Sequence, residues 1–311
     1  MSIHAPEEKK FTAADITLLN LEFNSSCNLR CQWCSLDHDK ERMVMSEDIL
    51  ARVMDELVAG QLPNLRRVDL HNAGETLLHP DLPRMLTIIR RARQNLNSKA
   101  TFGLLTNATL LTPVKSEQIV RSKAIDQMRF SLDGGTPELF ESMRKGASWN
   151  KVQANIYNFL KANEVAGRPI STEAICIIPP DLNESAYLDP QFKLLLSMID
   201  KVSLRPPHNW DGSVELEVDD SFYQEVAVDR INEVCFLLKR NLVVLPDGNV
   251  TVCCNDLNAR GVIGNIADQT LTQLATSPKR LEMLRKFSEG NKSNIELCKK
   301  CTGFYSSAKT N

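Results

Sequence analysis

The sequence predicts an α/β fold with a largely parallel sheet, followed by a small cysteine-rich C-terminal domain. Up to about residue 212, short apolar runs bounded by turn residues alternate with amphipathic stretches of helical period. Short apolar runs of this kind are typical of buried parallel strands. Beyond that point the alternation stops, and five of the nine cysteines fall in the last third of the chain. We therefore expect two domains, residues 1–212 and residues 213–311.

The first domain is expected to consist of strand–helix units. The predicted strands are Thr17–Phe23, Arg67–His71, Thr101–Thr106, Gln127–Leu132, Ile170–Ile178 and Lys201–Leu204. The predicted helices are Ser46–Ala59, Asp81–Asn95, Thr112–Arg121, Trp149–Asn163 and Glu184–Met198. Parallel strands joined through helices have right-handed crossovers, and six strands are fewer than the eight of a closed barrel. We therefore expect an open, partial (β/α)6 TIM-type barrel.

The second domain has a different pattern. Two apolar runs, Asn241–Leu245 and Asn249–Val252, flank the turn Pro246-Asp247-Gly248, which predicts a β-hairpin. Short helices are expected at Asp268–Ala275 and Ser277–Phe287. Because this segment has little apolar mass for a core of its own, we expect bound metal to stabilise it.

Composition excludes several classes of protein. The chain has 37 Lys and Arg residues against 39 Asp and Glu residues, whereas a general nucleic-acid binder needs a basic surplus. No apolar run approaches the roughly 20 residues that span a bilayer, and the polar stretch Met1–Lys10 shows no signal-peptide pattern. We expect a cytoplasmic protein without a membrane or nucleic-acid partner.

The first group of cysteines follows the first predicted strand. Cys27, Cys31 and Cys34 have the spacing C-x3-C-x2-C. Three thiolates on one loop can hold three irons of a four-iron cluster and leave the fourth iron open, and iron–sulfur clusters are held by such local runs. A structural zinc ion needs four protein ligands, which His38 could complete. Zinc is therefore the alternative at this loop.

This loop resembles the three-cysteine loop of the radical S-adenosylmethionine (radical SAM) enzymes, and three further segments of the chain resemble segments of the same family. Asn72-Ala73-Gly74-Glu75, after the second strand, is similar to a Gly-Gly-Glu stretch that binds the methionine amine in that family. Leu105-Thr106-Asn107-Ala108-Thr109 resembles a Thr-Asn-Gly stretch after the third strand. Phe130-Ser131-Leu132-Asp133-Gly134 resembles a Ser-Leu-Asp-Gly segment that meets the ribose and carboxylate of the cofactor.

The resemblance implies a set of cofactor-binding residues. They are Gly74, Glu75, Asn107, Ser131, Asp133 and Arg144, the last resembling an arginine common in the subgroup with cysteine-rich tails. All four segments follow predicted strands at their carboxyl ends, where an α/β barrel places its site. The resemblance also implies two 4Fe-4S clusters, S-adenosylmethionine as cofactor, and a reducing partner such as flavodoxin or ferredoxin.

The second group of cysteines resembles the opening of the SPASM and twitch extensions that follow some radical SAM barrels. Cys235 and Cys253 flank Gly248 in a C-x12-G-x4-C pattern, and Cys298-x2-Cys301 comes later. The resemblance implies one auxiliary four-iron cluster held by these four thiolates. A four-cysteine zinc site is the alternative, and Cys254, next to Cys253, is an alternative ligand.

Two cysteines are left as candidate hydrogen-atom donors. Cys176 lies in the fifth predicted strand, where a cysteine is usually a small apolar filler; Cys254 has the same two interpretations. Alternation puts Cys176 on the same face as Ala174, and that face is either the barrel lumen or the helix side.

The resemblance implies hydrogen-atom abstraction by a 5′-deoxyadenosyl radical. We expect oxidation of an alcohol of a small sugar, aminocyclitol or other polyol to a ketone, with the auxiliary cluster as electron acceptor. Only about 15 residues precede the first strand, which leaves no room for a peptide-recognition domain. The alternatives are an epimerase that uses Cys176 or Cys254, and a SPASM-type maturase acting on a peptide or protein. Candidate substrate contacts are Trp33, Asp37, His38, Asp39, His208, Asn209, Trp210 and Asp211, whose other interpretation is ordinary polar loop.

Overall fold

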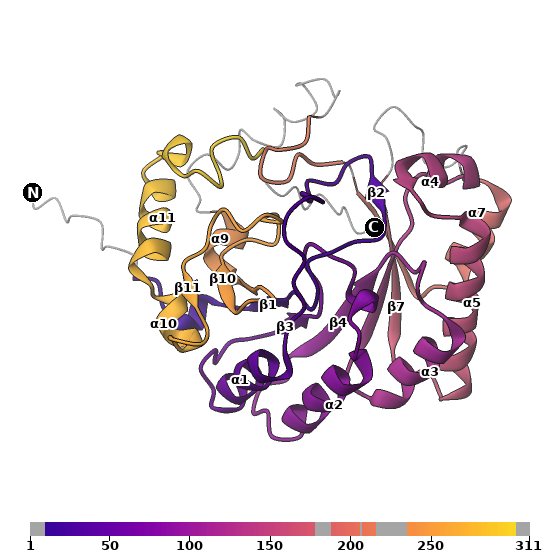
Figure 1. Cartoon of the computed structure of the whole chain (residues 1–311), viewed down its shortest axis with the longest axis horizontal. Coiled ribbons are helices and arrows are strands. Elements are labelled where there is room, and N and C mark those ends of the chain that lie inside the picture. Colours follow the sequence, from indigo (N-terminus) through magenta and orange to yellow (C-terminus); the bar gives the residue numbers. More distant parts are fainter. Residues whose placement is uncertain (1–9, 178–187, 206, 216–234, 303–311) are drawn as a thin grey trace, which may run out of the picture.

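A nine-stranded, mostly parallel sheet forms the centre of the protein (Figure 1). The computed structural model describes residues 10–177, 188–205, 207–215 and 235–302. The sheet order is β11-β10-β9-β1-β3-β4-β5-β7-β8. The strands are β1 (Leu18–Leu21), β3 (Arg67–Asp69), β4 (Thr101–Thr106), β5 (Gln127–Ser131), β7 (Ser171–Ile177), β8 (Lys201–Arg205), β9 (Asn241–Val244), β10 (Asn249–Thr251) and β11 (Gly264–Asn265). All six strands predicted for the barrel are present and parallel, which confirms the partial α/β barrel.

Five helices cover the outer face of the barrel strands (Figure 1). They are α1 (Glu47–Val58), α2 (Leu82–Arg93), α3 (Pro113–Ser122), α5 (Trp149–Val165) and α7 (Pro190–Ser197). The Ser46 side chain accepts a hydrogen bond from the backbone N–H of Ile49, so the predicted cap of α1 is confirmed. None of the helices in the described ranges is long and apolar enough to cross a membrane.

The start of α7 differs from the prediction. The helix expected at Glu184–Met198 begins at Pro190, because Asp189 caps it and a residue before proline disfavours the helical conformation. Residues 184–187 of that prediction, and Ile178 at the end of the fifth strand, lie outside the described residues.

Several short elements complete the chain. The antiparallel pair β2 (Arg30–Cys31) and β6 (Arg144–Lys145) brings the first cysteine loop to the end of α4 (Pro137–Met143). The remaining elements are η1 (Ala13–Asp15), η2 (Thr76–Leu78), α9 (Phe236–Arg240), α10 (Leu271–Ala275), α11 (Pro278–Ser288) and η4 (Lys292–Asn294). The two C-terminal helices that the sequence predicts are therefore present, with α10 starting three residues later than expected because Thr270 caps it.

The C-terminal hairpin continues the barrel sheet. β9 pairs in parallel with β1, and β10 pairs antiparallel with β9. One buried apolar cluster runs from the barrel strands through Leu242, Val250 and Leu274. The sequence suggested a weak core of its own for this segment, and this was wrong: its described part shares the core of the barrel. The domain boundary at residue 212 stays a prediction.

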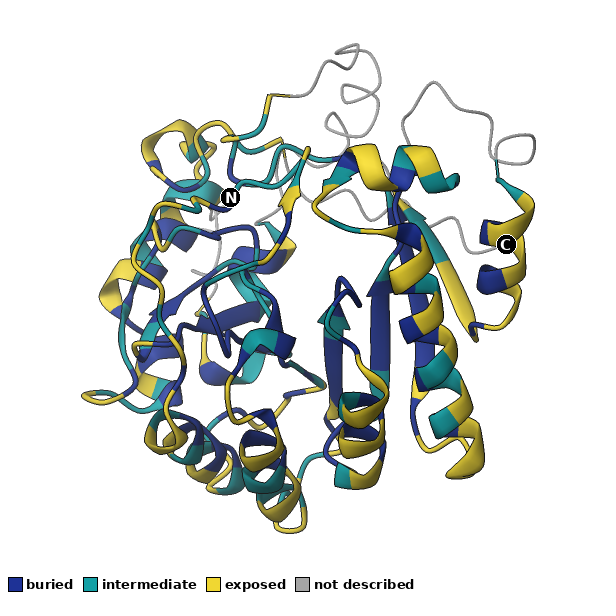
Figure 2. Ribbon diagram, turned by 45° about the vertical axis from the view of Figure 1, so that its right-hand side comes forward, coloured by how far each residue is buried: buried dark blue, intermediate teal, exposed yellow. Residues whose placement is uncertain are grey.

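The two faces of the barrel strands have opposite character. Side chains alternate across each strand, and Phe102, Phe130 and Ala174 belong to the apolar cluster under the helices. The residues between them, such as Arg129 and Glu173, point to the inner face. Figure 2 shows the strands largely buried and the helices exposed along their outer sides. Charged side chains on the inner face show that it does not form a second apolar core.

Candidate active site

The segment after β3 touches the start of the first cysteine loop. A Cβ on Gly74 would lie 1.9 Å from the backbone oxygen of Asn24 and 2.6 Å from that of Ser26. The backbone N–H of Glu75 donates to Ser26 O at 2.8 Å. Glycine is therefore required at position 74 for the two loops to meet.

Glu75 is a buried carboxylate that ties the ends of two strands together. Its Oε1 accepts hydrogen bonds from Leu77 N and Thr106 Oγ1, and its Oε2 accepts one from Asn107 N at 2.8 Å. Burial nonetheless raises the pKa of Glu75 above its usual value. With three donors already bound, this carboxylate fixes the loops after β3 and β4 in position.

Asn107 connects the loop after β4 to the first cysteine loop. Its Nδ2 donates to Cys27 Sγ at 3.8 Å and to Asn28 Oδ1 at 3.1 Å. Its Oδ1 accepts hydrogen bonds from the backbone and the hydroxyl of Thr109. The predicted site residue Asn107 therefore lies beside one of the three thiols.

Asp133 and Arg144 form a buried ion pair beside another of the thiols. The two side chains meet at 2.6 Å and are 7% and 11% exposed. Arg144 Nη1 also donates to Cys31 Sγ at 3.8 Å, and Asp133 Oδ1 accepts from Ile177 N at 2.8 Å. Burial works against the charge of Arg144, but the Asp133 carboxylate raises its pKa above the usual value. Ser131, the last residue of β5, is half-buried.

The three thiols of the first loop lie close enough to influence one another electrostatically. Burial, together with the nearby Glu75, Cys31 and Cys34, raises the pKa of Cys27 to about 11. Burial also raises the pKa values of Cys31 and Cys34, and the positive charge of Arg144 offsets only part of this rise. Thiolates are the ligands of iron–sulfur clusters, so binding a cluster here releases protons.

Buried polar atoms around these thiols match the polar groups of an amino-acid cofactor. Within the described residues, Asn72 Oδ1 and Arg144 Nε are buried without a hydrogen-bond partner. Asn72 Oδ1 is an acceptor, which the ammonium of a bound methionine moiety would satisfy, and Arg144 Nε is a donor, which its carboxylate would satisfy. The residues present thus fit S-adenosylmethionine next to a thiolate-held cluster.

The second group of cysteines also comes together. Cys235 and Cys301 both lie close enough to Cys253 and Cys298 to raise the pKa of each. Burial raises the pKa of Cys298 to about 12 and that of Cys253 well above its usual value. In the described part of the chain, no three His, Cys, Asp or Glu side chains converge on a single metal ion. The four ligands of a four-iron cluster bind different iron atoms and need not converge in this way.

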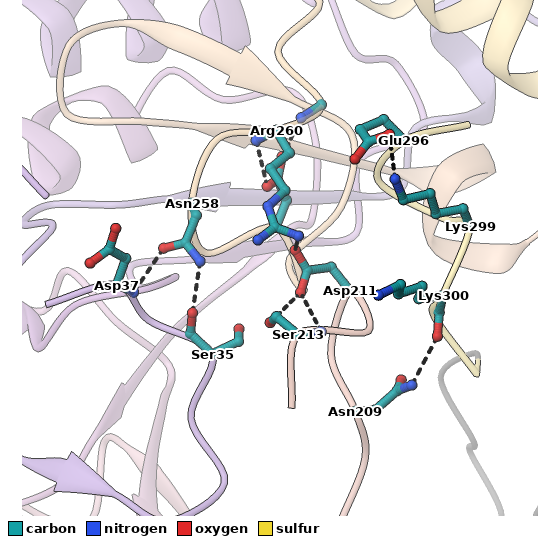
Figure 3. Close-up of polar contacts among 12 residues, drawn as sticks. Ser35, Asp37, Asn209, Asp211, Ser213, Asn258, Arg260, Glu296, Lys299 and Lys300 are labelled. Carbon is teal, nitrogen blue, oxygen red and sulfur yellow. Dashed lines mark hydrogen bonds and ion pairs between the residues drawn. The ribbon is translucent and has the colours of Figure 1, made fainter. Parts of the chain in front are cut away.

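Hydrogen bonds join the loops that carry the two cysteine groups (Figure 3). Asn258 Oδ1 accepts from Asp37 N at 2.9 Å, and Asn258 Nδ2 donates to Ser35 O at 2.7 Å. These contacts connect the residues that follow Cys34 with the residues that follow Cys253. The two loops are therefore held in a fixed relation to one another.

The loop after β8 binds the second cysteine group. Asn209 Nδ2 donates to Lys300 O, and the almost fully buried Asp211 carboxylate pairs with Arg260 at 3.1 Å (Figure 3). A Cβ on Gly212 would lie 2.3 Å from the Cβ of Lys300. Trp210 Nε1 donates to Trp33 O at 2.8 Å. Asn209, Trp210 and Asp211, three of the candidate substrate contacts, therefore make contacts within the protein, and their role toward a substrate stays a prediction.

Two family models match this sequence, and one of them decides its family. Residues 21–185, slightly more than half of the chain, match the Radical SAM superfamily. The chain belongs to the radical SAM superfamily. Residues 235–302 match SPASM, an iron–sulfur cluster-binding domain. A radical SAM domain binds S-adenosylmethionine and a four-iron cluster, and a SPASM domain binds auxiliary iron–sulfur clusters, so both kinds of cofactor belong to this chain.

Some relatives are similar over the whole radical SAM chain and others over part of it. The S-adenosyl-L-methionine-dependent 2-deoxy-scyllo-inosamine dehydrogenase of Niallia circulans is 24% identical over 92% of each chain. The tungsten-containing aldehyde ferredoxin oxidoreductase cofactor-modifying protein of Pyrococcus furiosus is 30% identical over 116 residues. The matches of the first curated relatives span only between a quarter and about half of their length.

Solved structures share the fold. BtrN in complex with AdoMet and 2-DOIA is 18% identical with a TM-score of 0.60, covering 95% of this chain and 94% of that one. Native anSMEcpe with bound AdoMet and Cp18Cys peptide is 18% identical with a TM-score of 0.65, covering 91% and 88%. These similarities confirm the radical SAM barrel with its C-terminal extension.

The spare cysteines of this radical SAM chain lie in different surroundings. Cys176 is 3% exposed and belongs to the apolar cluster on the helix side of β7. Cys254 lies close enough to Asp69 and Arg205 of the barrel strands for their charges to shift its pKa. Asp133 and Arg144 in turn influence the pKa of Cys176, so each spare thiol lies near charged residues of the barrel.

Sequence reasoning missed two parts of the radical SAM site. Glu22, at the end of β1, accepts hydrogen bonds from Asn72 Nδ2 and Ala73 N, both at 3.2 Å. Burial raises its pKa to about 7. The charged side chains of the inner face, led by the Asp69–Arg129 ion pair, were also missed. Their signal in the sequence is a charge at alternate positions of strands that are otherwise apolar.

Proposed function

We propose that this protein is a cytoplasmic radical SAM oxidoreductase that oxidises an alcohol of a small molecule to a ketone. The substrate class is a sugar, an aminocyclitol or another polyol. The proposal is supported by the similarity to 2-deoxy-scyllo-inosamine dehydrogenase, which extends over barrel and C-terminal segment alike. A flavodoxin or ferredoxin supplies electrons in this proposal.

In this proposal, the cofactor-binding residues form two sites. Cys27, Cys31 and Cys34 hold the first cluster, and Cys235, Cys253, Cys298 and Cys301 hold the auxiliary cluster. Residues that position S-adenosylmethionine are Gly74, Glu75, Asn107, Ser131, Asp133 and Arg144. When bound, S-adenosylmethionine and the two clusters supply hydrogen-atom abstraction and one-electron transfer. The protein orients the substrate and excludes water.

One observation carries the oxidative proposal. Asn258 bonds the backbone of both Ser35 and Asp37, so the loop of the auxiliary site rests on the loop of the first site. An oxidation that starts beside the first loop must deliver an electron to an acceptor. Direct contact between the loops keeps that acceptor close to the inner face of the barrel.

An epimerase is the second candidate, and the position of Cys254 favours it. An epimerase needs a thiol that donates a hydrogen atom to the substrate from inside the barrel. Cys254 lies near Asp69 and Arg205 of the inner face, and Cys176, which packs in the apolar cluster, lies near Asp133 and Arg144. Cys254 is the donor that we test first, and Cys176 stays the alternative donor.

Product analysis in deuterated water distinguishes the two functions. The anaerobically reconstituted protein is incubated with S-adenosylmethionine, a reductant and a panel of polyols and aminocyclitols. A ketone, formed equally by the Cys254→Ala variant, supports the dehydrogenase. An inverted alcohol that carries one solvent deuterium and disappears in that variant supports the epimerase. Failure to cleave S-adenosylmethionine would contradict both.

A further inference from the structure

The inner face of the barrel carries a network of charged side chains. Its members come from four strands: Arg67 and Asp69 from β3, Arg129 from β5, Glu173 from β7 and Arg205 from β8. Arg129 and Glu173 are paired in register, as are Glu173 and Lys201 on the next strand. Charges at these positions face away from the helices, toward the interior where a substrate of this barrel lies.

Asp69 joins two of the arginines. Its Oδ1 accepts hydrogen bonds from Arg67 Nε at 2.8 Å and from Arg129 Nη2. The Arg129 side chain crosses β4 at Gly103, where a Cβ would lie 2.9 Å from Asp69 Oδ1 and 3.3 Å from Arg129 Nη2. Gly103 therefore leaves the space through which the pair forms.

Glu173 has its own partners. Its Oε1 accepts from Ser203 Oγ at 2.6 Å and pairs with Lys201 at 3.2 Å, and its Oε2 accepts from Gln127 Nε2. Lys201 is 61% exposed, so its charge is largely solvated. Both carboxylates of the network are thus already bound to donors of the protein.

The arginines retain donors without partners. In the described part of the chain, the donors Arg67 Nη2 and Arg129 Nε are buried and have no hydrogen-bond acceptor, and Arg129 as a whole is only 6% exposed. Of the three arginines, Arg129 is buried, Arg67 is half-buried and Arg205 is exposed. Burial lowers the pKa of His71, which borders the network, to about 3, so that side chain adds no charge. Burial, together with the neighbouring Arg67 and Arg205, lowers the pKa of Arg129 to about 10. Buried donors without a hydrogen-bond partner are costly unless an acceptor, such as an anion, completes them.

We propose that this network binds a carboxylate or phosphate group of the substrate inside the barrel. The guanidinium fork suits either anion. The inference rests on the proposed function, because it narrows the substrate from polyols in general to anionic polyols such as sugar acids or sugar phosphates. Arg205 and the free N–H groups of Arg67 and Arg129 supply the positive charge, while Asp69 holds two of these side chains in place.

A matched set of ligands tests the proposal by calorimetry on the reconstituted protein with S-adenosylmethionine present. D-gluconate and sorbitol 6-phosphate carry the two anions on the same carbon chain, and sorbitol is the neutral control. We expect at least one anion to bind with one site per chain, at least tenfold more tightly than sorbitol. Which of them binds distinguishes carboxylate from phosphate. If sorbitol binds as tightly as both, or neither anion binds, the inference is wrong.

Variants locate the binding to this network. Arg205→Gln removes one positive charge without breaking an ion pair of the described residues, and should weaken binding of the anion at least tenfold. Since Arg129→Gln alone would leave Asp69 unpaired, Asp69→Asn/Arg129→Gln is the second variant and should weaken binding similarly. Arg121→Gln, on the outer helix α3 and 80% exposed, should bind as the unchanged protein does. Unaltered binding in both network variants would overturn the assignment.

Failure of this inference is distinguishable from failure of the proposed function. Formation of 5′-deoxyadenosine is measured on the same preparation. If it forms while sorbitol binds as tightly as both anions, or while neither anion binds, the anion site is wrong and the radical SAM oxidoreductase stands. If it does not form, the proposed function is wrong, whatever the calorimetry shows.

Discussion

The two cysteine groups differ in what surrounds their sulfurs. In the first loop, side chains from the barrel donate to sulfur: Asn107 to Cys27 and Arg144 to Cys31. In the second group, Cys235, Cys253 and Cys298 pack against the apolar core, and the hydrogen bond to Cys253 comes from a backbone N–H. The first group has three cysteines and polar atoms left over for a cofactor, whereas the second has four. The comparison indicates one site built to bind a reacting molecule and one built to hold a closed cluster.

Removing the first group should have the largest effect. In Cys27→Ala/Cys31→Ala/Cys34→Ala, we expect the iron content to fall from about eight to about four per chain. Formation of 5′-deoxyadenosine should fall below detection, because no thiolate remains to hold the first cluster. Iron analysis and chromatography of the reaction measure the two quantities.

Cys176→Ala is the matched control for that experiment. This cysteine is buried under the helices, so its loss should cost about 1 kcal/mol of folding free energy and leave iron and cleavage unchanged. Full iron content in the triple variant, or stoichiometric zinc in the unchanged protein, would contradict the assignment of the first loop.

Cys298→Ala should separate the two groups in the opposite sense. The auxiliary cluster should be lost, while 5′-deoxyadenosine formation stays within about tenfold of the unchanged protein because the first loop keeps its own ligands. Hydrogen exchange should speed up in residues 290–302. The hairpin β9–β10 should remain protected, since it pairs with β1 and shares the barrel core. Equal loss of protection in the hairpin would show that the cluster, and not the sheet, holds this segment.

Gly74→Ala tests the contact on which the first site depends. The added Cβ would lie 1.9 Å from Asn24 O, so we expect a loss of about 2–4 kcal/mol in the free energy of unfolding and loss of S-adenosylmethionine binding. Gly60→Ala is the control: its Cβ meets nothing within 4 Å, and its φ of +75° costs only about 1 kcal/mol. Chemical denaturation measures the free energy of unfolding of both variants. Equal losses in the two would show that the contact at Gly74 has no special role.

Glu22→Gln should have the smallest effect, visible as a change in pH dependence. Burial raises the pKa of Glu22 from 4.5 to about 7, so its contribution to stability is fully present below pH 4.5 and is lost as the pH rises through 7. The glutamine does not ionise. Relative to the unchanged protein, the variant should therefore gain about 1–3 kcal/mol between pH 4.5 and pH 8.

Unfolding measured across that pH range checks the prediction for Glu22. Glu117→Gln is the control, because the Glu117 side chain is 57% exposed on α3 and should show no such gain. A flat difference between the Glu22 variant and the unchanged protein would mean that this carboxylate is ionised in the folded state.

The barrel could be predicted from the sequence because its signals are local. Period-two and period-3.6 patterns mark the strands and helices, and caps such as Ser46 mark their starts. The pairing of β9 with β1 could not be predicted, since all four residues of β9 are buried and no alternation shows which face or neighbour it takes. The predicted start of α7 was wrong for a local reason, the proline at position 190.

The site was predictable where it follows a motif and not where it depends on tertiary contact. The cysteine spacings and the segments around Glu75 and Asp133 are contiguous in the sequence. The Asp69–Arg129 pair joins residues 60 positions apart across a glycine of the strand between them. The role of Asn258 likewise depends on how two distant loops dock, which no local pattern encodes.

Electron paramagnetic resonance of the reduced, reconstituted protein tests the difference between the two groups most directly. The account predicts two four-iron signals, of which only one changes when S-adenosylmethionine is added, because only the first cluster has an open iron. In Cys298→Ala/Cys301→Ala, the signal that remains should be the one that responds. A response of both signals or of neither, or a response that persists in Cys27→Ala/Cys31→Ala/Cys34→Ala, would contradict the account.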